Sequence, residues 1–309
     1  MIEVSNLTKR FGATTAVDDI SFTVQPGKVT GFLGPNGAGK TTTMRAIAGL
    51  DLPTAGTSSV NGNRMNQHAF PMHELGVLLD ANHIHHGRTA QAHLEALAAT
   101  HGIGTKRVHE VLDLTGLADV ARRRAGTFSL GMRQRLGIAA ALLGDPASFI
   151  LDEPINGLDP DGVVWVRTLL RRLAGEGRTV FLSSHLMSEM AQTADHLIVI
   201  GRGRLITDSS IQDVLGSGTD QSRVLVRATD PDRLAEALAA PGITVTRTAT
   251  GGLEVTGLEA AAVSGAAAAL GILLHELTTS TASLEEAYLS LTRSAVEYQT
   301  APENQESTP

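Results

Sequence analysis

The chain has 309 residues, of which 42% are hydrophobic, so it is long enough to form one to three domains with ordinary cores. No stretch of about eighteen or more apolar residues occurs, which argues against a membrane span, and the lack of cysteine excludes disulfides and thiolate zinc sites. A net charge of −7 and an aromatic content of 3% argue against a nucleic-acid partner.

The N-terminal part of the chain predicts three short strands and a helix, separated by turn residues. Alternating or continuous apolar residues mark the strands, and a segment without a breaker until Gly49 marks the helix. The predicted elements are strands at 2–4, 20–24 and 29–33 and a helix at 41–50.

A glycine-rich loop joins the third strand to this helix, and it fits the pattern Gly, four residues, Gly, Lys, Ser or Thr. Its backbone N–H groups are expected to surround a di- or triphosphate at the positive end of the helix. Lys40 is expected to reach the outer phosphates, and the Thr41 hydroxyl can ligate Mg²⁺. The predicted phosphate-binding residues are Gly34, Pro35, Asn36, Gly37, Ala38, Gly39, Lys40, Thr41 and Thr42.

The middle of the chain predicts a largely helical insertion at about residues 81–143. A buried strand at 75–79 ends at Asp80 and is followed by an irregular segment that contains His83, His85 and His86. These histidines allow either a metal site, for which no carboxylate or Cys completes the ligand set, or a solvated loop that faces a partner. The predicted helices are 89–100, 105–115 and a longer one that Ser129 caps and that runs to about residue 143.

Two adjacent acids follow the next buried strand, at residues 148–151. Asp152 is a hard oxygen ligand suited to Mg²⁺, and Glu153 can polarise an attacking water. Solvation at the end of a strand is the alternative interpretation of this acid pair. Further elements alternate, with helices at 163–174 and 186–194 and strands at 179–183 and 196–200. This order predicts an α/β fold with a mostly parallel sheet covered on both faces.

The pattern changes near Gly216-Ser217-Gly218, which predicts a domain boundary at about residue 215. Beyond it, strand, helix, strand, strand, helix, strand is the order of a ferredoxin-like α+β module. We therefore predict domains at 1–215 and 220–293, followed by a polar, disordered tail at 294–309.

Four further motifs restrict the class of nucleotide-binding protein to which the chain can belong. Residues 128–132 read Phe-Ser-Leu-Gly-Met, 149–154 read Phe-Ile-Leu-Asp-Glu-Pro, 157–160 read Gly-Leu-Asp-Pro and 183–185 read Ser-Ser-His. With the glycine loop, they resemble in sequential order the motifs of the nucleotide-binding subunit of ABC transporters, a P-loop ATPase. The resemblance covers about residues 1 to 215.

That resemblance implies a role for each matching residue. Glu153 and His185 would act in hydrolysis, with His185 sensing the γ-phosphate, and Phe11 would stack on the adenine. Three residues would contact the ATP bound by the facing subunit in a head-to-tail dimer with itself or a close homologue, namely Ser129, Gly131 and Asp159. Thr41, Asp152 and Asp80 would lie near the Mg²⁺, and Asp80 also marks the position where the family couples ATP to its membrane partner.

The sequence departs from the family pattern at three of these positions. Leu130 replaces a Gly and Met132 replaces a Gln of the signature, while Asp80 stands where the family usually has Gln. The loss of the Gln contact affects the expected dimer affinity and turnover.

The same resemblance implies a cytoplasmic ATP- and Mg²⁺-dependent ATPase on the inner face of the cell membrane. It would drive a separately encoded permease, as in the drug-export branch, and the docking segment would be residues 80–88 and the following helix. A soluble ABC-type ATPase acting in translation or DNA repair is the alternative, although such proteins usually carry two nucleotide domains, coiled-coil insertions or Cys-rich elements. Assignment to the P-loop kinases would leave four motif residues without a role, namely Ser129, Gly131, Asp159 and His185.

Overall fold

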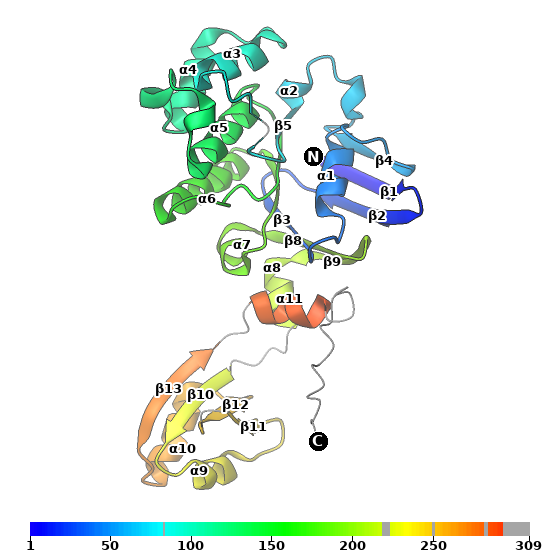
Figure 1. The fold of residues 1–309 in the computed structure, drawn as a ribbon. Helices are drawn as coiled ribbons and strands as arrows, with labels where there is room; N and C mark the ends of the chain where they lie inside the picture. Colours follow the sequence, from blue (N-terminus) through cyan, green and yellow to red (C-terminus); the bar gives the residue numbers. More distant parts are fainter. Residues whose placement is uncertain (83, 218–222, 249–250, 281–283, 293–309) are drawn as a thin grey trace, which may run out of the picture. The chain divides into compact units, whose positions relative to one another are not determined.

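The computed structural model describes residues 1–82, 84–217, 223–248, 251–280 and 284–292. The chain forms two compact units, one made mainly of Met1–Ile211 and the other of Gln212–Ser290 (Figure 1). The division at 211 and 212 lies beside the predicted boundary at 215. His83 and the predicted disordered tail fall outside the described residues. Within the described parts of the chain, every helix lacks the length and apolar character needed to span a bilayer.

A six-stranded sheet forms the centre of the first unit. Its strands lie in the order β5-β6-β7-β3-β8-β9, with parallel pairing from β5 to β8 and antiparallel pairing between β8 and β9. This arrangement confirms the predicted mostly parallel sheet. The strands are β3 (Val29–Leu33), β5 (Leu75–Leu78), β6 (Ser148–Leu151), β7 (Thr179–Ser183), β8 (His196–Gly201) and β9 (Arg204–Ser210).

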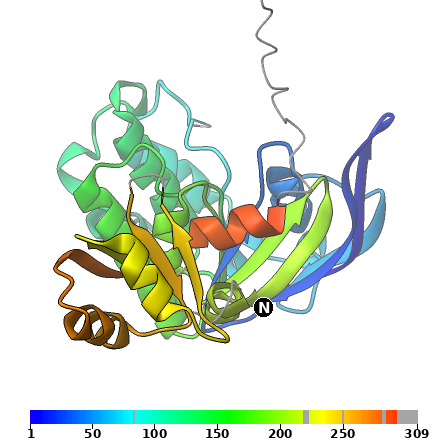
Figure 2. The same ribbon diagram turned by 90° about the horizontal axis from the view of Figure 1, so that it is seen from below.

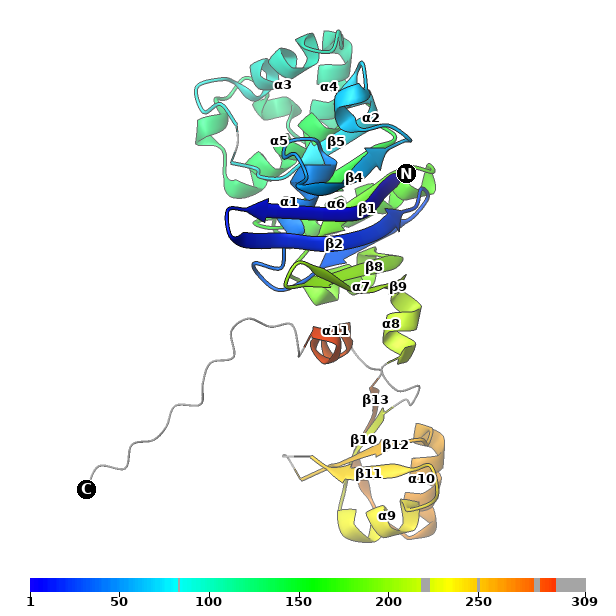
Figure 3. The same ribbon diagram turned by 90° about the vertical axis from the view of Figure 1, so that its right-hand side faces the viewer.

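A smaller antiparallel sheet lies against the large one, in the order β2-β1-β4. Its strands are β1 (Ile2–Phe11) and β2 (Thr14–Val24), both longer than predicted, and β4 (Ala55–Val60). Figure 2 shows the yellow-green β8–β9 hairpin beside the blue strands of this sheet, and Asp18 N donates to Gly203 O at 2.8 Å between them. Figure 3 shows β1 and β2 side by side along their length.

The core of this unit lies between the two sheets and the helix α1 (Lys40–Ile47). Phe22 of β2 contacts Phe32 of β3 and Phe181 of β7, with ring centroids 5.7 to 5.8 Å apart. Met44 and Ile47 of α1 are buried in the same cluster. Because burial of such side chains is the main driving force of folding, this cluster fixes α1 and its preceding loop against the sheet.

The remaining helices of the first unit follow the strands in the alternating order that the sequence predicts. α6 begins at Pro160 rather than 163, because Asp159 caps it by accepting from Gly162 N at 3.0 Å. The helices and short 3₁₀ turns are η1 (Met65–Gln67), α2 (Pro71–Glu74), α3 (Ala90–Ala99), α4 (Thr105–Leu114), η2 (Ala118–Val120), η3 (Ala125–Thr127), α5 (Leu130–Leu142), α6 (Pro160–Gly175) and α7 (Met187–Thr193). Helix α8 (Ile211–Ser217) begins at the last residue of this unit and belongs mainly to the second.

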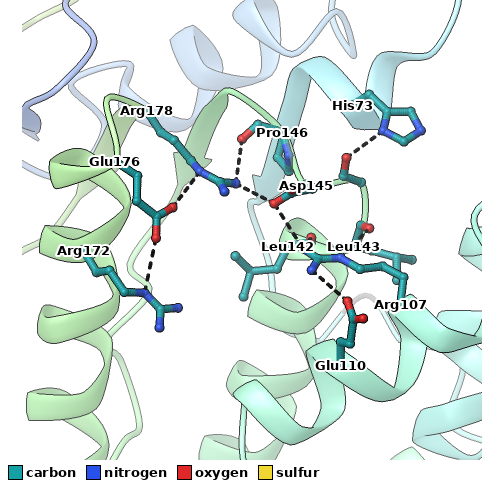
Figure 4. A network of polar contacts seen from close by, with 11 residues as sticks. His73, Arg107, Glu110, Leu142, Leu143, Asp145, Pro146, Arg172, Glu176 and Arg178 are labelled. Atoms are coloured by element: carbon teal, nitrogen blue, oxygen red, sulfur yellow. Dashed lines mark hydrogen bonds and ion pairs between the residues drawn. The ribbon is translucent and has the colours of Figure 1, made fainter.

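Helices α3, α4 and α5 form the predicted helical insertion and pack against one another, and they bury Leu94, Val108 and Leu136 respectively. A polar network fixes the C-terminal end of α5, as Figure 4 shows. Arg107 of α4 donates to the carbonyl of Leu142 at 2.8 Å, which caps α5, and Asp145 accepts from Arg178 at 2.8 Å. Hydrogen bonds therefore connect the C-terminal end of α5 both to α4 and to the segment that leads into β7.

A glycine in β3 makes room for α7. A Cβ at Gly31 would lie 2.3 Å from the Sδ atom of Met190, whose side chain is buried. Asp195, just after α7, accepts from Val29 N at 2.9 Å and so holds the start of the same strand. The strand before the glycine-rich loop and the helix after His185 are thus packed together.

The second unit has the strand order β11-β12-β10-β13 with antiparallel pairing throughout. Its elements are β10 (Arg223–Ala228), α9 (Pro231–Leu238), β11 (Thr244–Arg247), β12 (Leu253–Thr256), α10 (Ala260–Ala269), β13 (Leu274–Ser280) and, partly in this unit, α11 (Leu284–Thr292). Val224 and Val255 of the sheet share one core with Leu234 of α9 and Val263 of α10. This is the predicted ferredoxin-like topology.

Candidate functional site

The glycine-rich loop occupies residues 34–39, between the end of β3 and the start of α1. Gly37 and Gly39 have φ of 81° and 102°, in the left-handed region that favours glycine. A Cβ at Gly39 would lie 2.5 Å from Ala16 O, and one at Gly34 would lie 2.5 Å from Ile200 O. These glycines are therefore required both by the turn and by the close approach of neighbouring backbone.

A cavity of about 310 Å³ opens in front of this loop. It is lined by Ala16, Asn36, Gly37, Ala38, Gly39, Lys40, Thr41, Thr42, Asp152 and Glu153. The first turn of α1 carries no acidic side chain of its own, so no residue of the helix offsets the positive end of its dipole, which faces the cavity. All of the predicted phosphate-binding residues except Gly34 and Pro35 thus line one cavity together with the predicted acid pair.

The Lys40 side chain lies along the loop, and its Nζ donates to Gly34 O at 2.6 Å. Burial lowers the pKa of Lys40, while the nearby carboxylates of Glu153 and Asp152 act in the opposite direction and favour the charged form. A cation held by backbone carbonyls at the mouth of a phosphate cavity can exchange these partners for phosphate oxygens.

Asp152 lies at the end of β6 and joins two neighbouring elements. It accepts from Thr41 Oγ1 of α1 at 2.7 Å and from Ser183 Oγ at the end of β7. Ser183 Oγ in turn accepts from Glu153 N at 3.0 Å. A carboxylate beside a threonine hydroxyl is a pair of hard oxygen donors, which is the donor chemistry that Mg²⁺ prefers. The predicted pair Thr41 and Asp152 therefore fits this ion.

Glu153 has a φ of 50°, which is uncommon for a residue with a Cβ. Its Oε2 lies 2.7 Å from His185 Nδ1, and its carbonyl accepts from Gln134 Nε2 at 2.9 Å. The structure therefore brings the two predicted hydrolytic residues, Glu153 and His185, into direct contact beside the cavity.

Asp80 lines a cavity that also includes Glu153. This second cavity, of about 170 Å³, is lined by Leu79, Asp80, Ala81, Asn82, Leu130, Gln134, Asp152, Glu153 and Asn156. Asp80 Oδ1 accepts from Asn82 N at 2.8 Å. The carboxylate thus lies within the same group of residues as Asp152, at the start of the predicted docking segment.

Four other predicted site residues do not line the phosphate cavity. Phe11, at the end of β1, is 52% exposed, and Lys9 Nζ lies 4.8 Å from its ring centroid. Ser129 caps α5 by accepting from Met132 N at 3.2 Å, and Asp159 caps α6. Gly131 packs on the loop before α6, where a Cβ would lie 3.1 Å from Gly157 O.

Sequence reasoning missed three residues that belong to this site. Ala16 of β2 closes the phosphate cavity, Ser183 bridges Asp152 and Glu153, and Gln134 holds the Glu153 carbonyl. A signal existed for Gln134 alone, because a polar residue on the apolar side of a predicted helix needs a hydrogen-bond partner.

The strand, glycine loop and helix, together with the acids at the end of the neighbouring strand, define a P-loop nucleotide hydrolase. Residues 17–156 match the family described as ABC transporter. The chain belongs to the ATP-binding subunits of ABC transporters and is an ATP hydrolase, as the sequence predicts. Residues 222–285 match a family described only as a domain of unknown function.

Individual relatives and solved structures agree with this assignment. The bacitracin transport ATP-binding protein of Enterococcus faecalis is 40% identical over 217 residues, 69% of this chain and 70% of the relative. The lantibiotic transport ATP-binding protein of Streptococcus pyogenes is 33% identical over 208 residues, 67% of this chain and 90% of the relative. A solved ATP-binding subunit of an ABC transporter matches with a TM-score of 0.65 and 26% identity, over 71% of this chain and 93% of that one.

Proposed function

We propose that two copies of this chain, or one copy and a close homologue, close over two ATP molecules and drive a separately encoded membrane permease that exports small molecules. The observation that carries the proposal is the convergence of Lys40, Thr41, Asp152 and Glu153 on one cavity in front of the glycine loop. The proposal includes a cytoplasmic location on the inner face of the membrane.

In the proposed reaction, water attacks the γ-phosphorus and the bond from that phosphorus to the β–γ bridging oxygen breaks, which yields ADP and phosphate. Glu153 accepts the proton of the water, and His185 holds the Glu153 carboxylate through the 2.7 Å contact. Lys40 and the backbone N–H groups of the loop bind the phosphates.

Thr41 and Asp152 would hold Mg²⁺, and Asp80 is a further candidate ligand from the adjoining cavity. When bound, the ion neutralises charge on the β- and γ-phosphates. Phe11 is exposed at the end of β1, where its ring is available for the proposed stacking on adenine.

The dimer proposal assigns Ser129, Gly131 and Asp159 to the ATP of the facing subunit. Ser129 and Asp159 lie at helix N-termini, which are suited to phosphate oxygens. The export proposal follows from relatives whose names describe bacitracin, lantibiotic and Nod factor transport. The same naming disfavours the alternative role in translation or DNA repair.

The hydrolysis proposal is tested by measuring ATP turnover of the purified full chain and its Glu153→Gln variant. We expect turnover to fall about 100-fold or more, because the variant cannot take the proton of the water. Glu176→Gln is the matched control, because Glu176 lies at the end of α6 and pairs with Arg178. Similar turnover in wild type and Glu153→Gln would remove Glu153 from this role.

The dimer and permease proposals need separate measurements. Glu153→Gln with Mg²⁺ and ATP should elute as a dimer in size-exclusion chromatography, whereas the same variant with ADP should elute as a monomer. The tagged chain should co-purify from detergent-solubilised membranes with a protein that has several apolar segments of about 20 residues. Recovery with ribosomes or DNA in place of such a protein would contradict the proposal.

A further inference from the structure

The backbone of Glu153 has a conformation that its own sequence disfavours. Its φ of 50° lies in the left-handed region, which is costly for a residue with a Cβ. The next residue is Pro154, and a residue before proline prefers extended conformations. Because two local preferences oppose this conformation, contacts from surrounding elements must maintain it.

Both backbone polar groups of Glu153 have partners among the described residues. The N–H donates to Ser183 Oγ at 3.0 Å, from the end of β7. The carbonyl accepts from Asn156 N at 3.1 Å within the same turn, and from Gln134 Nε2 at 2.9 Å. Gln134 therefore provides a contact from α5, a helix distant in sequence from the Glu153 turn.

Packing alone does not explain a glutamine at this position. Gln134 is 4% exposed, and the other buried residues of α5 are Leu136, Ile138, Ala139, Ala141 and Leu142. A buried amide is costly unless its hydrogen bonds are made, whereas an apolar side chain of similar length would fill the same volume without that cost. The hydrogen bond to Glu153 is the feature that an apolar residue could not provide.

The same helix reaches the Glu153 segment one turn earlier. Leu130 lies four residues before Gln134, so both side chains project from one face of α5. Leu130 packs on Gly157, where a Cβ would lie 2.2 Å from Leu130 Cδ2. Helix α5 thus contacts both ends of the segment 153–157, through Gln134 at Glu153 and through Leu130 at Gly157.

We propose that Gln134 is a positioning residue for Glu153. Its amide holds the Glu153 peptide in the left-handed conformation, so that the carboxylate meets His185 and the phosphate cavity. This inference rests on the proposed function, because it assumes that Glu153 accepts the proton of the attacking water.

The first test compares Gln134→Met and Gln134→Glu with wild type in the purified full chain. Both variants keep the length of the side chain and remove the amide N–H donor. We expect kcat for ATP to fall roughly 10- to 100-fold, because a small displacement of a reacting group has this effect. The Kd for ATP should change by less than about twofold, because the phosphate loop is not altered.

Leu136→Met is the matched control, since Leu136 is buried in the same helix and the change nearly conserves volume. It should leave kcat within about twofold of wild type. A fall in kcat as large as that of the Gln134 variants, or an unchanged kcat in both folded Gln134 variants, would overturn the inference. Thermal unfolding identifies folded variants, and Gln134→Glu keeps a polar group if the Met variant fails to fold.

The second test repeats Gln134→Met in the Glu153→Gln background. If Gln134 acts through the Glu153 carboxylate, the added change should lower the residual turnover by less than about twofold. An equal loss in both backgrounds would show a structural role and overturn the inference. Wild-type turnover in Glu153→Gln alone would instead reject the proposed function, so the two failures are distinguishable.

Discussion

His185 Nδ1 lies 2.7 Å from Glu153 Oε2, and the backbone N–H of His185 approaches the same oxygen at 3.4 Å. The two residues follow neighbouring parallel strands, β7 and β6, whose carboxyl ends meet at one edge of the sheet. The contact therefore joins the proposed proton acceptor to the residue proposed to sense the γ-phosphate.

Replacement of His185 tests the function of this contact. We expect His185→Gln to lower kcat for ATP about 10- to 100-fold, because the carboxylate loses a partner that fixes its direction. His196→Gln is the matched control, since His196 pairs with Asp208 at 2.6 Å between β8 and β9, outside the residues that line the phosphate cavity. Equal turnover in the two variants would contradict the assignment.

Lys40 should contribute to ATP affinity as a cation. Lys40→Met is expected to raise the Kd for ATP about 10- to 100-fold, the effect of losing a charged hydrogen bond. Because burial lowers the pKa of Lys40, its charge is lost at a lower pH than that of an exposed lysine. The ATP affinity of wild type should therefore decline as pH rises towards the alkaline range.

Nucleotide titrations at several pH values measure both effects. Lys106→Met serves as the control, because the Lys106 side chain is 93% exposed on α4. If Lys40→Met shows the same alkaline decline as wild type, the decline does not arise from Lys40.

The contact between Leu130 and Gly157 should limit what can replace the glycine. Gly157→Ala places a Cβ 2.2 Å from Leu130 Cδ2 at a φ of 76°, so we expect a loss of about 1–3 kcal/mol in the free energy of unfolding. Leu130→Ala in the same chain should restore part of this loss. Chemical denaturation of the four chains of this cycle gives the coupling energy.

Gly102→Ala separates conformational strain from overpacking in this experiment. Gly102 has a φ of 67°, but no atom lies within 4 Å of an added Cβ. The decrease in the free energy of unfolding that Gly102→Ala causes should therefore be the same with and without Leu130→Ala. If Leu130→Ala also restored stability to Gly102→Ala, direct contact would not be the cause of the effect at Gly157.

The Asp145 network should make stability depend on pH. The hydrogen bond from Arg178 holds the pKa of Asp145 below its ordinary value, with further help from the charges of Arg178, Arg107 and His73. A depressed carboxyl pKa stabilises the fold above the pKa of the unfolded chain, about 4, and this contribution is lost as pH falls below that value.

Asp145→Asn should lower the free energy of unfolding by at most about 1 kcal/mol at neutral pH, because the Asp145 side chain is 60% exposed. The difference from wild type should shrink below about pH 4. Asparagine tolerates the φ of 50° at this position, so the change reports on charge. Asp113→Asn, an exposed site on α4, is the control, and a difference that persists at low pH would contradict the account.

Three buried strands of the large sheet could be predicted to the residue, and β5 and β8 to within one residue. β3, β6 and β7 have the predicted bounds, because parallel strands covered on both faces read as continuous apolar runs. The phosphate loop was equally predictable, since its pattern places glycines where the turn requires them.

The sequence did not predict β9 or the full length of β1 and β2. β9 is an edge strand whose residues are half-buried or exposed, so it lacks a clear alternation of apolar residues. The β8–β9 hairpin turns at Arg202 and Gly203, both with positive φ, and Arg-Gly is a weak hairpin signal beside Asn-Gly.

The contacts of Ser183 and Gln134 depend on tertiary structure. Ser183 reaches Asp152 only because β6 and β7 are neighbours, and Gln134 reaches Glu153 only because α5 packs against the turn after β6. Local pattern carries no information on such pairings, since they join residues far apart in the chain.

Met190 lies outside every nucleotide motif, yet it packs on Gly31 of β3, the strand that leads into the glycine loop. An extra methyl group on the β3 glycine would meet the thioether at 2.3 Å and displace the helix that follows His185. Oxidation to a sulfoxide would likewise introduce a polar oxygen into a space built for sulfur and carbon. Damage at a methionine that does not line the phosphate cavity would therefore disturb both the strand that leads into the glycine loop and the helix that follows His185.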